Sequence, residues 1–140
     1  MKITTQHAQA VIAAAIAKAQ EINVPMNIAV LDDGAHLKAF LRMDGAVLGS
    51  IDIAFKKART AVLFETNSEA VWEYCKPGGP APGLELTNDV LATFAGGVPL
   101  RRGNEIVGAI GVSGGAVSQD ASVATAGAAA FAVTCPETQS

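Results

Sequence analysis

Residues 96–115 constrain the fold of this chain more than any other stretch. Two runs of strand-forming or small apolar residues flank the pair Gly103-Asn104. Because glycine and asparagine both tolerate a positive φ, this pair predicts the tip of a β-hairpin. Glycine weakens the interior of a strand, so Gly108 and Gly111 in the second run indicate that something lies close to the backbone there. The candidates are a packed helix, a second chain and a ligand.

A second hairpin is predicted in the first half of the chain. Residues 26–31 are largely apolar, as in a strand buried on both sides. Residues 36–43 resume in strand fashion, with alternate side chains directed to opposite faces. The turn signal Asp32-Asp33-Gly34 lies between these two runs and joins them into one hairpin.

Three helices are predicted around the two hairpins. Residues 8–19 place apolar side chains at i, i+3, i+4 and i+7, and residues 51–64 form a similar stripe after Ser50, a suitable N-cap. The third helix is expected over residues 117–133, with Asp120 in its first turn, where a carboxylate suits the helix dipole. A helix without other charges, as this one is, has to be covered on most sides.

A shorter helix is expected to begin at residue 67 or 68. Residues 76–83 follow it and contain three prolines and three glycines, which exclude a helix or a central strand. We interpret this loop as a surface flap.

The order helix–strand–strand–helix–short helix–strand–strand–helix does not alternate as a parallel doubly wound sheet requires, so it predicts an α+β fold. A length of 140 residues fits one domain, which we assign to residues 1–135, with a flexible tail over 136–140. Hydrophobic residues make up 50% of the chain, more than a domain of this size needs for its own core, so we expect self-association.

Composition excludes several classes of function. The net charge is −3, and the ten basic and thirteen acidic residues form no basic stripe, so nucleic-acid binding is not expected. No apolar run approaches the roughly 20 residues of a membrane span, and the N-terminus has no signal-peptide pattern. We therefore expect a cytoplasmic protein. Cys75 and Cys135 do not have the spacing of a metal site.

Candidate ligand-binding side chains lie in the first half of the chain. His36, Phe40 and Arg42 share one face of the second predicted strand and could line a pocket for a flat anionic ligand. An ordinary half-solvated sheet face is the alternative. Lys57, on the second helix, either belongs to a solvated basic face or reaches a carboxylate of a ligand or a neighbouring subunit.

The pattern Gly-x-Ser-x-Gly at 111–115 matches a nucleophile elbow. Both histidines, His7 and His36, precede Ser113, whereas the hydrolase order places the histidine after the serine. A tight turn at Ser113 and Gly114 that offers backbone N–H groups to an anion is the better interpretation. A single histidine is also enough to ligate haem iron, so His7 and His36 are candidate metal ligands.

Several motifs resemble the GlcG/HbpS-like family, which includes the C-terminal domain of PduO-type proteins and is often described as haem-binding or haem-degrading. They are Gly-Gly-Val-Pro-Leu at 96–100, Gly-Ala-Ile-Gly-Val-Ser-Gly-Gly at 108–115, Gln119-Asp120, the run 30–37, the run 42–46 and the run 57–61. The resemblance implies a profilin-like fold with an antiparallel sheet of about five strands, and assembly into dimers to octamers. The residues at family motif positions are His36, Arg42, Lys57, Ser113 and Asp120.

Two main functional hypotheses remain open, together with a purely structural or assembly role. In the first, the chain binds haem or a related planar carboxylated ligand, with His36 or His7 near the iron and Arg42 or Lys57 pairing with propionates. In the second, it is a small enzyme or accessory protein of a catabolic operon that acts on an organic acid. Arg42 and Lys57 would then hold the carboxylate, and His36 or Asp120 would move a proton. Both hypotheses require the two hairpins to frame one cleft.

Overall fold

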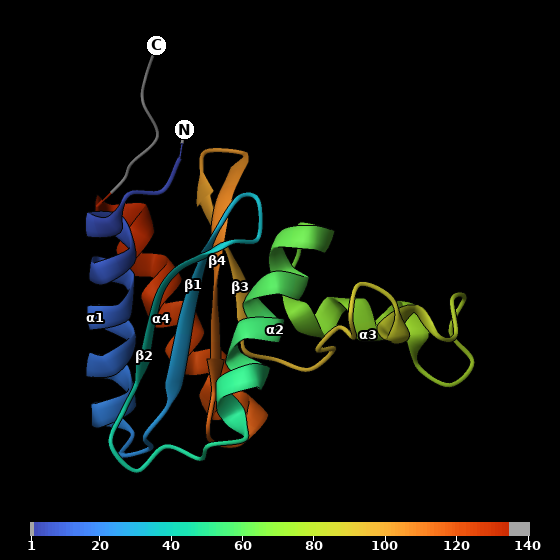
Figure 1. Cartoon of the computed structure of the whole chain (residues 1–140), viewed down its shortest axis with the longest axis horizontal. Coiled ribbons are helices and arrows are strands. Elements are labelled where there is room, and N and C mark those ends of the chain that lie inside the picture. The colour runs from blue at the N-terminus through green and yellow to red at the C-terminus, as the bar shows by residue number, and fades with distance from the viewer. Residues whose placement is uncertain (1, 135–140) are drawn as a thin grey trace.

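The structure is a computed structural model that describes residues 2–134. Its elements follow the predicted order, which is confirmed (Figure 1). In chain order they are α1 (Thr5–Glu21), β1 (Asn27–Asp32), β2 (Leu37–Arg42), α2 (Ser50–Phe64), the 3-10 helix η1 (Ser68–Val71), α3 (Trp72–Cys75), the 3-10 helix η2 (Leu84–Leu86), β3 (Gly97–Arg102), β4 (Glu105–Ser113) and α4 (Val117–Thr134). The fold is therefore α+β.

The two hairpins form one antiparallel sheet with the strand order β2-β1-β4-β3. Both hairpins belong to the same sheet because β1 pairs with β4 in its centre. The expected number of about five strands is wrong, since the sheet of the described residues has four. The segment before β3 contributes no strand, and η2 is the one regular element in residues 84–94.

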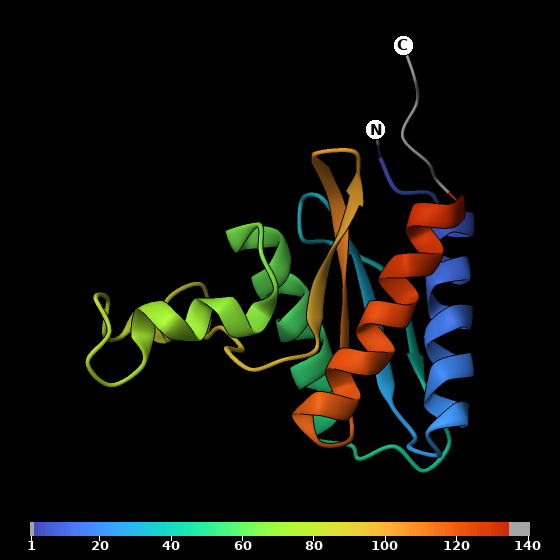
Figure 2. The same cartoon turned by 180° about the vertical axis from the view of Figure 1, so that it is seen from behind.

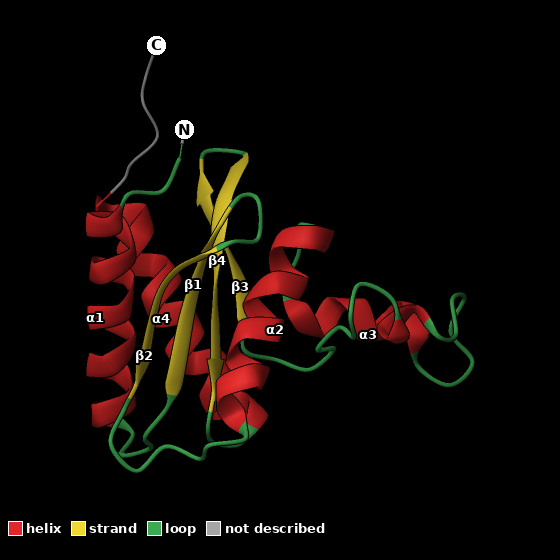
Figure 3. Cartoon of the chain, viewed as in Figure 1, coloured by secondary structure: helices red, strands yellow, loops and turns green. Residues whose placement is uncertain are grey.

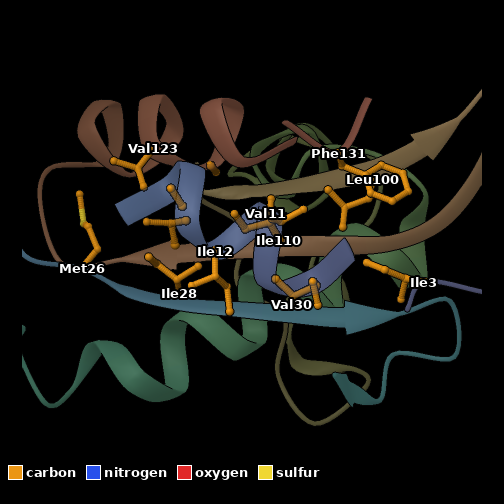
Figure 4. Close-up of a cluster of buried hydrophobic side chains, with 14 of the residues drawn as sticks. Ile3, Val11, Ile12, Met26, Ile28, Val30, Leu100, Ile110, Val123 and Phe131 are labelled. Carbon is orange, nitrogen blue, oxygen red and sulfur yellow. The ribbon is translucent and has the colours of Figure 1, made fainter. Parts of the chain in front are cut away.

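Helices cover both faces of the sheet. α1 and α4 lie side by side on one face, and α2 lies on the other (Figures 1 and 2). The larger core cluster fills the space between the sheet and the α1–α4 layer (Figure 4), and its large side chains include Val11, Ile28, Val30, Ile110 and Phe131. This layer holds the larger of the two clusters of buried apolar side chains.

On the opposite face, α2 lies unusually close to the sheet. Gly97 and Gly111 face each other across β3 and β4. A Cβ atom at Gly111 would overlap the carbonyl oxygen of Ala54, and one at Gly97 would overlap the carbonyl oxygen of Lys57. A packed helix, α2, therefore lies against the backbone at Gly111. It was one of the three candidates that the sequence analysis considered, with a second chain and a ligand.

Local departures from the predictions have simple causes. α2 begins at Ser50 itself, and Gly49 is the N-cap, without a capping side chain. In β2, Ala39 and Leu41 pack against the core as their alternation predicts. Leu37 remains 55% exposed, because the register shifts at the start of the strand, between Val30 and Leu31 of the partner strand.

Residues 68–95 form an arm that projects from the body of the protein (Figure 3). The arm contains η1, α3, η2 and the loop 76–83 predicted as a flap. It carries exposed aromatic side chains, of which Trp72 is 45% and Tyr74 is 56% exposed.

Among residues 2–134, no helix has both the length and the apolar character needed to cross a membrane. The tail predicted over residues 136–140 lies outside the described residues. The assignment of residues 1–135 to one domain stays a prediction.

We predict that Gly111→Ala destabilises the protein by about 3 kcal/mol or more, because the methyl group forces α2 away from the sheet. Gly49→Ala is the matched control, since nothing lies within 4 Å of its added Cβ. Urea unfolding of both variants measures the difference. Equal stability of the two variants would contradict the close approach of α2.

Candidate functional site

A buried ion pair joins α2 to α4. Lys57 is fully buried, and Asp120 is 2% exposed. The Nζ atom of Lys57 lies 2.8 Å from Oδ2 of Asp120 and donates a second hydrogen bond, of 2.9 Å, to the carbonyl oxygen of Val112. The structure thus brings together two residues that the sequence analysis selected separately and that lie 63 positions apart in the chain.

The small residues of α2 explain how a lysine comes to lie in the interior. Ala54, Ala58 and Ala61 are fully buried and allow the helix to settle on the glycine-bearing strands. Gly96 passes so near Lys57 that an added Cβ would lie 2.8 Å from Nζ, and its φ of +131° suits glycine. Lys57 is therefore enclosed by backbone and cannot turn out to solvent without moving α2 or the segment before β3.

Asp120 is equally well fixed. Its Oδ1 atom accepts a 2.9 Å hydrogen bond from the backbone N–H of Gly115, so each of its oxygens has a donor. Gln119 Oε1 accepts from the N–H of Ala116 at 2.8 Å and completes the start of α4. The sequence predicted that the turn after Ser113 offers backbone N–H groups to an anion. In the structure, the N–H groups of Gly115 and Ala116 donate instead to the side chains of Asp120 and Gln119 in α4.

The third side of the Lys57 ammonium faces an aromatic ring. Nζ lies 5.0 Å from the centroid of Phe94, within the range of a cation–π interaction. Because burial withdraws the ammonium from water, the pKa of Lys57 lies below its ordinary value of 10.5, although the hydrogen bond and the charge of Asp120 act in the opposite direction.

A cavity of about 410 Å³ lies on the arm side of this ion pair. Its lining residues are Glu69, Trp72, Thr93, Phe94, Ala95 and Val117. Phe94 belongs both to the cavity wall and to the surroundings of Lys57, and it is 44% exposed. The volume falls within the range typical of small-molecule sites, and an apolar wall with few polar groups is also typical of them.

His36 lies at the other end of the sheet. Its side chain is 83% exposed, and Nδ1 is 3.6 Å from Oδ1 of Asp32. Asp32 pairs with Gly108, whereas Ser113 pairs with Asn27. Five residues of strand, or about 17 Å, therefore separate the two ends. His36 and Asp120 therefore do not frame one small cleft within the chain. Both functional hypotheses required such a cleft, so this part of the sequence-based prediction is wrong.

Arg42 and Phe40 lie on the edge strand β2. Arg42 pairs with Asn27, which pairs in turn with Ser113, so Arg42 is at the same end of the sheet as the ion pair but two strands, or about 10 Å, away from β4. Arg42 is exposed and Phe40 is half-buried. Ser113 is 4% exposed, and Gly114 continues the chain from it toward Asp120.

His7 has a local structural role. Its Nδ1 accepts from the backbone N–H of Thr4 at 3.3 Å, and its own N–H donates to the Thr4 hydroxyl at 3.0 Å, as in a capping box. The ring also packs edge-on against Phe131, with 5.7 Å between centroids. Within residues 2–134, no group of three or more His, Cys, Asp or Glu residues could hold a metal ion.

Sequence reasoning missed Trp72 and Phe94 as site residues. Both flank the proline- and glycine-rich loop, and the arm that carries them contributes little to the main core. Large aromatic side chains on a segment that cannot bury them were the available signal.

Comparison with known proteins identifies the family. Residues 3–129 match the family described as haem degrading protein HbpS-like, and the chain belongs to this HbpS-like family. The predicted resemblance is thus confirmed. A 15.0 kDa protein from the dhaT–dhaS intergenic region of Citrobacter freundii is 40% identical over 119 residues, which are 84% of this chain and 84% of that protein.

Solved structures share the fold over nearly the whole chain. Protein ORFY of Klebsiella pneumoniae superposes with a TM-score of 0.91 at 36% identity, covering 94% of this chain and 92% of that one. PduOC, solved as a complex with haem, superposes with a TM-score of 0.87 at 32% identity, covering 93% and 95%.

We predict that Lys57→Met or Asp120→Asn alone destabilises the protein by about 3–5 kcal/mol, because each leaves a buried charged partner uncompensated. The double variant should cost less than the sum of the two. Lys56→Met and Asp52→Asn are matched controls on the exposed pair of the same helix. They should change the free energy of unfolding by no more than about 1 kcal/mol. Single variants at 57 and 120 as mild as these controls would contradict a dry ion pair.

The lowered pKa of Lys57 predicts a pH dependence. Between that lowered pKa and 10.5, the unfolded chain holds the Lys57 proton more tightly than the folded chain does. The free energy of unfolding of the wild type should therefore rise with pH in this window, compared with the double variant Lys57→Met/Asp120→Asn. As the pH falls through the same window, this gain in stability is lost. Urea unfolding of both proteins, from about pH 7 to about pH 10, measures the difference. A difference that shrinks as pH rises would show the opposite shift.

Proposed function

We propose that this protein binds a planar, largely apolar small molecule, haem or a related carboxylated ligand, in the cavity beside the arm. The observation that carries the proposal is the wall formed by Trp72, Phe94 and Val117, three side chains that are each about half exposed. Exposed aromatic surface of this kind is stabilised when a flat ligand covers it. The haem complex of the relative PduOC supports this choice of ligand.

The cavity suits the macrocycle of haem better than its iron. Two aromatic rings can contact a flat ring system, but no histidine, cysteine or methionine is among the described residues of the lining. In this proposal His36 or His7 of a neighbouring copy of the chain would bind the iron, because neither residue lines the cavity of its own chain. Haem, when bound, supplies redox and ligand-binding chemistry at iron, and the protein's part is to hold and shield it.

A ligand carboxylate would lie at the open rim of the cavity. Lys57 already donates to Asp120 and Val112 and lies behind Phe94, so it meets a propionate only after that ring moves. Arg42 is exposed, but it belongs to β2, at the edge of the sheet opposite β3, and it lines a different hollow with Ile16 and Gln20. In this proposal Arg42 of a neighbouring copy of the chain would contact the carboxylate, and Lys57 would position Phe94.

Catalysis on an organic acid is less well supported. The buried ion pair favours it, since an ammonium and a carboxylate lie within 2.8 Å. However, the two charges neutralise each other, and His36 lies at the far end of the sheet. A binding role uses the same residues without requiring them to exchange protons with a substrate.

We also propose self-association, from dimers to octamers, of a cytoplasmic protein with a profilin-like fold. Strand β2 is an unpaired edge of the sheet. Leu37, Val47 and Leu48 are 55%, 60% and 66% exposed. Apolar side chains beside an unpaired edge favour contact with another copy of the chain.

A haem titration followed at the Soret band tests the proposed ligand. Trp72→Ala should weaken binding at least about tenfold, or by about 1.4 kcal/mol, because it removes one aromatic wall. Tyr74→Ala is the matched control, an exposed aromatic on the same short helix that does not line this cavity.

The same titration examines iron ligation. Loss of the Soret shift in His36→Ala or in His7→Ala identifies the axial ligand. Absence of any shift in the wild type removes haem from the proposal, and equal affinity of Trp72→Ala and Tyr74→Ala removes the cavity.

A further inference from the structure

Lys57 is chemically the most unusual group in the described chain, and haem binding does not use its nitrogen. An ammonium has three N–H donors. Two of them are directed to Val112 and Asp120, and the third side faces the ring of Phe94. Phe94 in turn forms part of the cavity wall. The nitrogen is therefore one side chain away from a cavity large enough for a small molecule.

We propose that Lys57 is a carbonyl-reactive amine, which forms an imine with a small neutral aldehyde that enters through the cavity when the Phe94 side chain turns aside. This inference goes beyond the proposed binding function and does not depend on haem.

The charges around Lys57 favour a neutral carbonyl compound over an anion. Asp120 already neutralises Lys57, so an incoming carboxylate would gain little from the ammonium and would be repelled by Asp120. Glu69 is in the cavity lining, and no lysine, arginine or histidine is among the described residues there. An aldehyde with a short apolar chain meets the apolar side chains of the wall without this repulsion.

Phe94 can move without unfolding the arm. It lies in residues 91–96, which form neither helix nor strand. The hydroxyl of Ser68 donates to the carbonyl oxygen of Phe94 at 2.7 Å and accepts from the N–H of Gly97 at 2.9 Å, so the backbone is held on both sides of the turn. Rotation of the half-exposed ring is then a side-chain event, which needs no backbone rearrangement.

The proton transfers balance within the ion pair. Asp120 takes one proton from the Lys57 ammonium, and the free amine attacks the carbonyl carbon. The carbonyl oxygen receives that proton from Asp120 and becomes the hydroxyl of a carbinolamine. Asp120 then takes the second nitrogen-bound proton and returns it to the hydroxyl, which leaves as water. The products are one water molecule and a protonated imine, which keeps the third proton of the original ammonium and stays paired with the Asp120 carboxylate, and no oxidant or reductant is required.

The dry surroundings supply the activation. A lysine in an apolar site loses its proton more readily than one in water, which is how Schiff-base lysines become nucleophilic. The lowered pKa of Lys57 has this cause. Lys56, its neighbour on the exposed side of α2, pairs with Asp52 at 3.5 Å and remains in contact with water.

Reductive trapping with butanal and cyanoborohydride near pH 7, followed by peptide mass spectrometry of the ligand-free protein, tests the proposal. Lys57 should be modified severalfold faster than Lys56, because its lowered pKa raises the fraction of free amine and the cavity leads an aldehyde to its nitrogen. The wild type provides this comparison without any variant that risks unfolding. In urea, where the local environments are lost, both lysines should react at similar rates.

Two further arms examine the route and the substrate class. Phe94→Ala should raise the rate at Lys57 severalfold and leave Lys56 unchanged. Glyoxylate, an anionic aldehyde, should modify Lys57 with a smaller preference over Lys56 than butanal does. The proposal is overturned if Lys57 reacts no faster than Lys56, if Phe94→Ala leaves the Lys57 rate unchanged, or if glyoxylate is preferred. Haem titration is a separate measurement, so failure here leaves the haem proposal standing.

Discussion

Burying the charge of Lys57 is the constraint on which the rest of this site depends. An ammonium taken out of water costs several kcal/mol, and only well-placed partners offset that cost. Here the partners come from three elements, namely a strand carbonyl at Val112, a helix carboxylate at Asp120 and the ring of Phe94 on the arm. Displacing any one of these elements uncovers the charge. The ion pair therefore links the position of α2 to that of α4 and of the arm.

The arm depends on the body for its placement at this point. Thr60 Oγ1 accepts from the N–H of Ala92, and Ser68 bridges Phe94 and Gly97. These hydroxyls fix the end of an otherwise projecting segment, so that an aromatic ring closes over Lys57 on one side and borders a cavity on the other. A rigid body that supports a ring on an irregular segment is a common way to build a small-ligand site.

Most of the fold could be predicted from short-range sequence patterns. Apolar periodicity located α1, α2 and α4, and turn residues located both hairpins, because these signals arise from neighbours in the chain. The number of strands came from family resemblance alone, and it was wrong.

The site was harder to predict. Lys57 was selected as a contact for a carboxylate, but its partner, Asp120 of the same chain, is brought near only by tertiary packing. His36 was grouped with Arg42 by alternation, which says nothing about the length of the sheet between His36 and Ser113. Phe94 belongs to no helix or strand pattern, and only its place as an aromatic residue on an irregular segment marks it.

The glycines under α2 have an evolutionary consequence. A side chain at Gly97 or Gly111 would lift the helix, and with it the lysine that reaches across to α4. Lineages that acquire bulk at either position lose the geometry that keeps the amine dry, and selection would then favour an uncharged residue at 57 together with a neutral one at 120. Glycine at 97 and 111 and the ion pair between 57 and 120 should therefore vary together among related sequences, even though the four positions lie on four different elements.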